Sequence, residues 1–243
     1  PEGVPLWAYA IFQTVFCATS ATIVSGAMAE RTKFSAYCIY SAAISLLIYP
    51  VSGHWIWGGG WLAELGFHDF AGSVAVHMVG GICALIGAKI LGPRIGKYDK
   101  NGKPRAILGH NLTFAALGVF ILWFCWFGFN GGSSLAADGI GISAFLNTNT
   151  AAATAMVTWV FLDCVLGRRP SAMGAAIGAV VGLVAITPSA GWVTVGQSIF
   201  ISFITTIICN MAVTYKKKAN VVDDALDVFP THGLGGIVGT VFT

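Results

Sequence analysis

Two matching strings decide the fold: HMVGGI at residues 77–82 and HGLGGI at residues 232–237. Both follow the pattern H-x-x-G-G-I, and each places an ionisable histidine, His77 or His232, inside an otherwise apolar run. A polar side chain held in hydrocarbon is costly and usually faces a pathway or a partner. The repeated string therefore predicts an internal repeat with one central site between its two halves.

The composition around these strings is that of a membrane protein. Apolar residues make up 56% of the chain and charged residues 9%, whereas soluble domains carry about 25% charged residues. No charged residue occurs between Val4 and Ala29, a longer stretch than the roughly 20 residues that a helix needs to cross the hydrocarbon core. The alternating pattern of a β-barrel does not occur.

Apolar runs predict eight membrane-crossing helices in a single transmembrane domain, residues 1–243, with helix ends placed to within about two to four residues. The predicted helices cover residues 6–29, 34–57, 70–92, 108–130, 143–166, 171–187, 192–215 and 227–243.

The basic residues indicate how these helices cross the membrane. All 13 Lys and Arg lie in or beside the first, third, fifth and seventh connections, and the even-numbered connections carry none. The positive-inside rule then puts the odd connections in the cytoplasm and the N-terminal end outside. The net charge of +3 reflects this topology, so nucleic-acid binding is not indicated.

Cysteine and glycine point to packing. The six cysteines lie singly in six different spans, so neither a metal site nor a disulfide framework is indicated. Gly174, Gly178 and Gly182 form a G-x-x-x-G-x-x-x-G ridge, which predicts a close contact between helices.

An aspartate stands near the start of each helix that bears a string histidine. Asp69 precedes His77, and Asp227 precedes His232. A carboxylate there accepts hydrogen bonds from free backbone N–H groups and complements the helix dipole. Capping explains both aspartates, and attraction of a cation near the outer mouth is a second option for Asp69.

The two histidines are expected to meet near the middle of the membrane. With a rise of about 1.5 Å per residue, His77 lies roughly 12 Å beyond Asp69, and His232 roughly 7 to 8 Å beyond Asp227. The two helices run in opposite senses in the predicted topology. A pair of interhelical hydrogen bonds with only a packing role is the alternative.

Aromatic residues gather on the predicted outer side. Trp57 ends the second span, Phe129 nearly ends the fourth, and Ser133 follows in the next turn, so all three are expected to share an outer vestibule. Phe12 and Phe16 lie on one face of the first span. Trp57 could hold a small cation by cation-π attraction, or it could anchor the helix at the membrane interface.

Several ordered motifs resemble one family. They are GAMAER at 26–31, HWIWGGG at 54–60, DFAG at 69–72 ahead of His77, WFGFN at 126–130, and DDALDVFPTHG at 223–233. Together they resemble the ammonium transporter family, on its bacterial and plant branch rather than its Rhesus branch. The resemblance covers essentially the whole chain.

The resemblance implies a homotrimer in the cell membrane with one pore per subunit for ammonium and methylammonium. His77 and His232 would be the twin pore histidines, and Phe16 and Phe129 the stacked phenylalanine gate. Trp57, Ser133 and Phe16 would form the outer cation site, with the helix-start carboxylate of Asp69 below it. No enzyme activity, cofactor or metal is implied.

The resemblance also implies an inverted-repeat transporter fold of eleven helices, of which this chain would hold the third to the tenth. The expected task is to separate ammonium from K⁺. Ammonium can lose a proton and cross as ammonia, and two neutral imidazoles could relay that proton, whereas K⁺ has none to lose. The alternatives are an ammonium sensor that signals to a cytoplasmic partner and a channel for water or a neutral solute. A PII-type signalling protein is a candidate partner for the basic loops.

Overall fold

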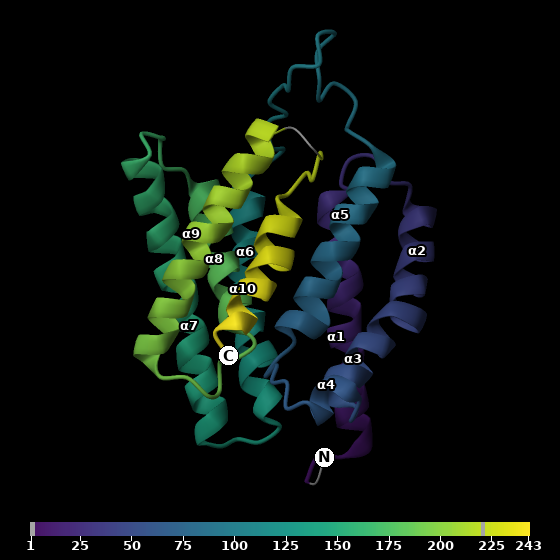
Figure 1. The fold of residues 1–243 in the computed structure, drawn as a ribbon, viewed down its shortest axis with the longest axis vertical. Coiled ribbons are helices and arrows are strands. Elements are labelled where there is room, and N and C mark those ends of the chain that lie inside the picture. The colour runs from purple at the N-terminus through teal and green to yellow at the C-terminus, as the bar shows by residue number, and fades with distance from the viewer. Residues whose placement is uncertain (1–2, 220–221) are drawn as a thin grey trace.

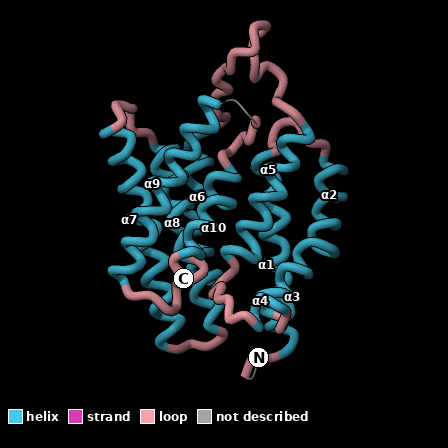
Figure 2. Tube along the Cα trace, in the orientation of Figure 1, coloured by secondary structure: helices cyan, strands magenta, loops and turns pink. Residues whose placement is uncertain are grey.

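The described part of the protein is built from helices joined by loops. The computed structural model describes residues 3–219 and 222–243, in which eight long helical runs form a bundle (Figures 1 and 2). This confirms the predicted all-helical membrane fold. The runs are α1 (Leu6–Ala27); α2 (Phe34–Ala43) continued by a π-helical segment (Ile44–Ile48) and α3 (Tyr49–Trp57); a π-helical segment (Ser73–Met78) continued by α5 (Val79–Leu91); α6 (Leu112–Gly131); α7 (Gly139–Val165); α8 (Ala172–Ile186); α9 (Val195–Ala219); and a π-helical segment (Phe229–Leu234) continued by α10 (Gly235–Val241). A short helix, α4 (Trp61–Glu64), lies in the second connection.

Capping side chains set two helix starts that hydropathy placed less well. Helix α6 begins at Leu112 rather than at residue 108, because the Asn111 side chain accepts a hydrogen bond from Phe114 N at 3.0 Å. Helix α7 begins at Gly139 rather than at residue 143, because Asp138 accepts from Gly141 N at 2.8 Å. A polar cap fixes the first turn whatever the apolar content of the following residues.

Five of the runs are long and apolar enough to cross a membrane by length and composition: those containing α1, α2 with α3, α5, α6 and α9. Helix α8 is apolar but shorter. Helix α7 carries buried polar residues such as Asn147, Thr148 and Asp163. These side chains lower its hydropathy but face neighbouring helices, so they do not exclude α7 from the bundle.

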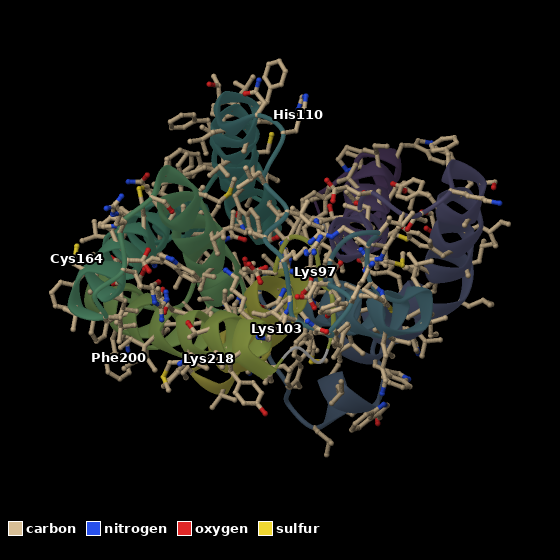
Figure 3. The ribbon with its side chains drawn as sticks, turned by 90° about the horizontal axis from the view of Figure 1, so that it is seen from above. Lys97, Lys103, His110, Cys164, Phe200 and Lys218 are labelled. Carbon is tan, nitrogen blue, oxygen red and sulfur yellow. The ribbon has the colours of Figure 1, made fainter. Side chains whose placement is uncertain are left out.

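The helices alternate in direction, which separates the connections into two sets. In Figure 1 the connections at residues 28–33, 92–111, 166–171 and 222–228 lie at the upper end of the bundle, and those at residues 58–72, 132–138 and 187–194 lie at the lower end. The upper end, seen from above in Figure 3, therefore carries the basic residues. The sequence pattern predicted this segregation of charge.

The glycine ridge of α8 does bring two backbones together. A Cβ atom on Gly182 would lie 2.3 Å from Ala151 O, and one on Gly178 would lie 2.9 Å from Ala155 O. Both oxygens belong to α7, so the ridge packs directly against that helix. This confirms the packing role predicted for the G-x-x-x-G pattern.

An ion-pair network ties three connections together at the basic end. Arg94 Nε lies 2.8 Å from Asp223 Oδ2, and Arg94 Nη1 lies 2.6 Å from Glu30 Oε2. Arg31 Nη2 also donates to Asp223 O at 2.6 Å. The network joins the end of α1, the end of α5 and the segment before α10. Burial alone would raise the pKa of Asp223, but its hydrogen bonds with Arg94 hold that pKa at about 2.

We expect Asp223→Asn to remove about 2 kcal/mol of stability at neutral pH, because the pKa of Asp223 is about 2 in the folded protein and near 4 when unfolded. A lowered carboxyl pKa stabilises the fold above pH 4, and this contribution is lost as the pH falls from about 4 to 2. Thermal unfolding in detergent between pH 6 and pH 2 measures it. The variant should lose part of the acid sensitivity, whereas Glu64→Gln, at an exposed residue, should keep it. If the unfolding temperatures of Asp223→Asn and the parent change with pH in the same way, Asp223 does not have this stabilising role.

Candidate functional site

The two string histidines meet inside the bundle. His77 Nδ1 lies 3.2 Å from His232 Nδ1, and the two rings stack with centroids 5.4 Å apart. His77 is 1% exposed, and its Nε2 atom is buried without a hydrogen-bond partner in the described residues. Each histidine lies in a π-helical segment, Ser73–Met78 or Phe229–Leu234. Such local widening of a helix is common at functional sites.

Glycines let the two histidine-bearing helices approach this closely. A Cβ atom on Gly81 would lie 2.4 Å from Gly233 Cα, and one on Gly236 would lie 2.7 Å from Ser73 O. Gly81 and Gly236 are the second glycines of the two strings. The strings therefore cross each other at their glycines, and this crossing positions the histidines.

A stack of aromatic rings continues from the histidine pair. The His77 ring stacks on Trp126 with centroids 5.0 Å apart and lies 5.5 Å from Phe129. Phe129 stacks on Phe16 at 4.3 Å with an interplanar angle of 15°. Phe16 is 1% exposed. The structure thus brings together Phe16, Phe129 and His77 from α1, α6 and the segment before α5.

The stack ends at Trp57, at the lower end of the bundle. The rings of Phe16 and Trp57 meet edge to face at 5.8 Å, and Phe12 lies 4.6 Å from Phe16. Ser133 lies one turn beyond Phe129, and its hydroxyl donates to Phe129 O at 2.7 Å. The four predicted pathway and cation-site residues near this end, with Phe12, are therefore in ring contact or one turn away.

Asp69 caps the helix that carries His77. Its carboxylate accepts hydrogen bonds from four backbone N–H groups at 2.8 to 3.1 Å, and its own backbone O accepts from Trp57 Nε1 at 2.8 Å. Burial raises the pKa of Asp69, and the four N–H donors oppose that rise. The predicted capping role is confirmed, and the same residue holds the Trp57 ring in place. The donors are Gly72, Ser73, Val74 and Ala75.

The matching cap on the second helix is Asp224, and the prediction of Asp227 as its side-chain cap was wrong. Asp224 accepts from Val228 N and Phe229 N, both at 2.9 Å. The Asp227 side chain instead pairs with Lys216 at 2.6 Å, and Asp227 has a positive φ of 55°. The correct residue had a signal in the sequence. Asp69 precedes His77 by the same interval that separates Asp224 from His232.

The site combines a buried stack of aromatic rings with a pair of protonatable side chains. Aromatic rings line the stretch from Trp57 to His77. A cation placed among these rings would lose its hydration shell, at a large cost in free energy. Each neutral imidazole offers one donor and one acceptor nitrogen. Together with the crossing repeats, this arrangement places a central polar pair between two halves of a helical membrane protein.

The chain belongs to the ammonium transporter family, whose family model matches residues 2–243. It is 44% identical to a putative ammonium transporter of Methanothermobacter thermautotrophicus, over 99% of this chain and 56% of that protein. It is 46% identical to the ammonium transporter Amt2 of Archaeoglobus fulgidus, over 98% of this chain and 52% of that protein. The chain therefore spans about half the length of the curated relatives it matches.

Solved structures of similar proteins share the fold. A protein described as a sensor Amt protein superimposes with a TM-score of 0.93 at 42% identity, over 97% of this chain and 60% of that one. Mep2 of Candida albicans superimposes with a TM-score of 0.90 at 37% identity, over 98% of this chain and 52% of that one.

Proposed function

We propose that the protein to which this chain belongs transports ammonium or ammonia, and methylammonium, across a membrane, with no enzymatic step. The observation that carries the proposal is the pair of histidines in contact at 3.2 Å behind the stacked rings of Phe16 and Phe129. A pathway for a hydrated ion would need polar groups along its walls, which the ring stack does not offer.

In this proposal the cation is first held at the outer end, against Trp57, Phe16 and Ser133. Ammonium then gives up one proton, and neutral ammonia passes between the rings of Phe16 and Phe129. The released proton moves separately along His77 and His232, and it rejoins ammonia on the far side. K⁺ carries no proton, so it would have to enter the dry segment as a bare ion, at a cost of several kcal/mol.

The direct test is solute flux through the full-length protein in liposomes. Ammonium and methylammonium gradients should drive uptake or current, and equal gradients of K⁺ should not. A protein that passes water or a neutral solute at the same rate as ammonium would support the channel alternative instead.

We expect Trp57→Leu to weaken recruitment of ammonium at low concentration by up to about thirtyfold, because a cation-π contact contributes up to roughly 2 kcal/mol. High ammonium should restore much of the rate. Uptake measured over a range of ammonium concentrations tests this. Trp55→Leu is the control, because Trp55 is 41% exposed and contacts Trp61 away from the ring stack. An unchanged concentration dependence in Trp57→Leu would leave Trp57 as an interfacial anchor.

We further propose that the protein is a homotrimer in the cell membrane, with the basic end of the bundle in the cytoplasm. Asn101, in the third connection, should then react with a thiol reagent only from inside when it is replaced by Cys, and Ser134→Cys only from outside. The parent chain supplies the background from its six native cysteines. Labelling of both positions from the same side of a sealed membrane would overturn this orientation.

A sensing role is the second candidate, because a similar solved protein carries the description of a sensor. A sensor would bind ammonium and change its contact with a cytoplasmic partner while moving little solute. Binding without flux in the liposome assay would favour it. For either role, the basic connections are the surface that a PII-type partner would meet.

A further inference from the structure

A cavity lies at the basic end of the bundle, away from the histidines. It is an open cavity of about 400 Å³ between the end of α7, the start of α8 and the end of α9. In Figure 3, Cys164 near the end of α7 and Lys218 near the end of α9 mark two sides of this group of helices. Four cationic side chains and a single carboxylate line it: Arg168, Arg169, Lys217, Lys218 and Asp163.

Arg168 is fixed at one wall of the cavity by its neighbours. Its Nη2 atom donates to Thr214 Oγ1 at 2.8 Å and its Nη1 atom to Asn210 Oδ1 at 3.3 Å, with Asp163 Oδ1 at 3.5 Å. The one carboxylate of the cavity is therefore already paired. Among the described residues, Arg169 and Lys218 take part in none of the ion pairs, so their charges remain available.

Most of the remaining lining is apolar, with Trp159, Met173, Ile177 and Val213 as its large side chains, and Met173 is 40% exposed. The hydroxyl residues Ser171 and Thr214, with Gly174, complete the cavity. A small hydrated anion gains nothing from such a lining, whereas the glycerol and the first methylenes of a lipid would be sheltered by it. The helix α8 also begins here, at Ala172, and its positive end adds to the attraction for an anion.

We propose that this cavity binds the phosphate of an anionic phospholipid headgroup, with Arg169 and Lys218 facing the phosphate and the apolar lining covering the glycerol region. Basic pockets between membrane helices near the membrane surface suit such headgroups. The proposal does not depend on what the central pathway carries. The ligand chemistry is that of a phosphate diester, and the apolar lining favours lipid over free phosphate as its source.

The test uses the full-length protein in phosphatidylcholine nanodiscs, titrated with phosphatidylglycerol and, separately, with inorganic phosphate. Retained lipid is counted by native mass spectrometry. Arg169→Gln combined with Lys218→Gln should weaken phosphatidylglycerol binding by about thirtyfold, since each cation near a membrane surface contributes about a factor of five. Lys33→Gln combined with Lys89→Gln removes the same charge at the same end of the bundle, from exposed residues, and should leave that binding unchanged.

Three outcomes would overturn the proposal. Equal weakening in both double variants would show attraction by overall surface charge rather than by the cavity. Inorganic phosphate that competes at concentrations similar to the lipid would show an anion site without a lipid preference. Undiminished binding in Arg169→Gln with Lys218→Gln would remove the site altogether. Unfolding temperatures in pure phosphatidylcholine should be the same for the parent and both variants, which separates binding from folding.

Discussion

In the full-length protein, His77→Asp should let K⁺ through the pathway, so that the preference for ammonium over K⁺ falls by about a hundredfold. His77 is 1% exposed and lies between Phe129 and His232. A carboxylate there would give a bare cation a counter-charge and offset roughly 3 kcal/mol of the cost of holding it in the membrane. Currents carried by ammonium and by K⁺ in the same liposomes measure the change.

His54→Asp makes the same substitution at an exposed residue and should leave selectivity unchanged. His232→Ala removes the partner imidazole without adding charge, so it should slow ammonium flux and keep K⁺ out. Parental selectivity and rate in both His77→Asp and His232→Ala would limit the pair to helix packing. Before the currents are compared, each variant should elute from size-exclusion chromatography at the same volume as the parent.

Gly81→Ala should destabilise the protein by about 3 kcal/mol. The new Cβ atom would lie 2.4 Å from Gly233 Cα, and a backbone atom cannot rotate away as a side chain can. The two histidine-bearing helices must separate, which also breaks the 3.2 Å contact between His77 and His232. Thermal unfolding in detergent and ammonium flux should fall together.

The matched control is Gly118→Ala in α6. A Cβ atom on Gly118 has no other atom within 4 Å, and alanine is the better helix former. This variant should therefore be as stable as the parent or slightly more so. If Gly81→Ala and Gly118→Ala unfold at the same temperature, the crossing of the two strings does not hold the halves together.

Hydropathy predicted the eight helical runs because lipid demands long apolar segments whose backbone polar groups are all paired within the helix. It predicted their ends less well, because Asn111 and Asp138 fix helix starts through single side-chain hydrogen bonds. The meeting of His77 and His232 could be predicted as well, since matching strings on helices of opposite sense reach a similar depth. The π-helical widening around each histidine has no signature in hydropathy.

The second helix cap could have been found from the sequence. Asp227 is nearer to its helix and suggested a cap by position alone, but its positive φ of 55° turns the backbone there, and its carboxylate pairs with Lys216. Asp224 keeps the spacing to the histidine that Asp69 has. Applying the internal repeat to the flanking carboxylates as well as to the histidines would have identified it. The contacts of Trp57 with Phe16 and Asp69 depend on side-chain packing across helices, which no local pattern records.

The contact between His77 and His232 joins the same atom, Nδ1, of two residues that occupy equivalent places in the repeat. A twofold axis that relates the two halves would pass midway between these two nitrogens. A hydrogen bond between two such nitrogens nevertheless requires one to carry hydrogen and the other to lack it. With perfect symmetry, donation from His77 to His232 and donation from His232 to His77 would have the same energy. Trp126 stacks on His77, so the surroundings of the two rings differ, and this difference selects which ring is the donor.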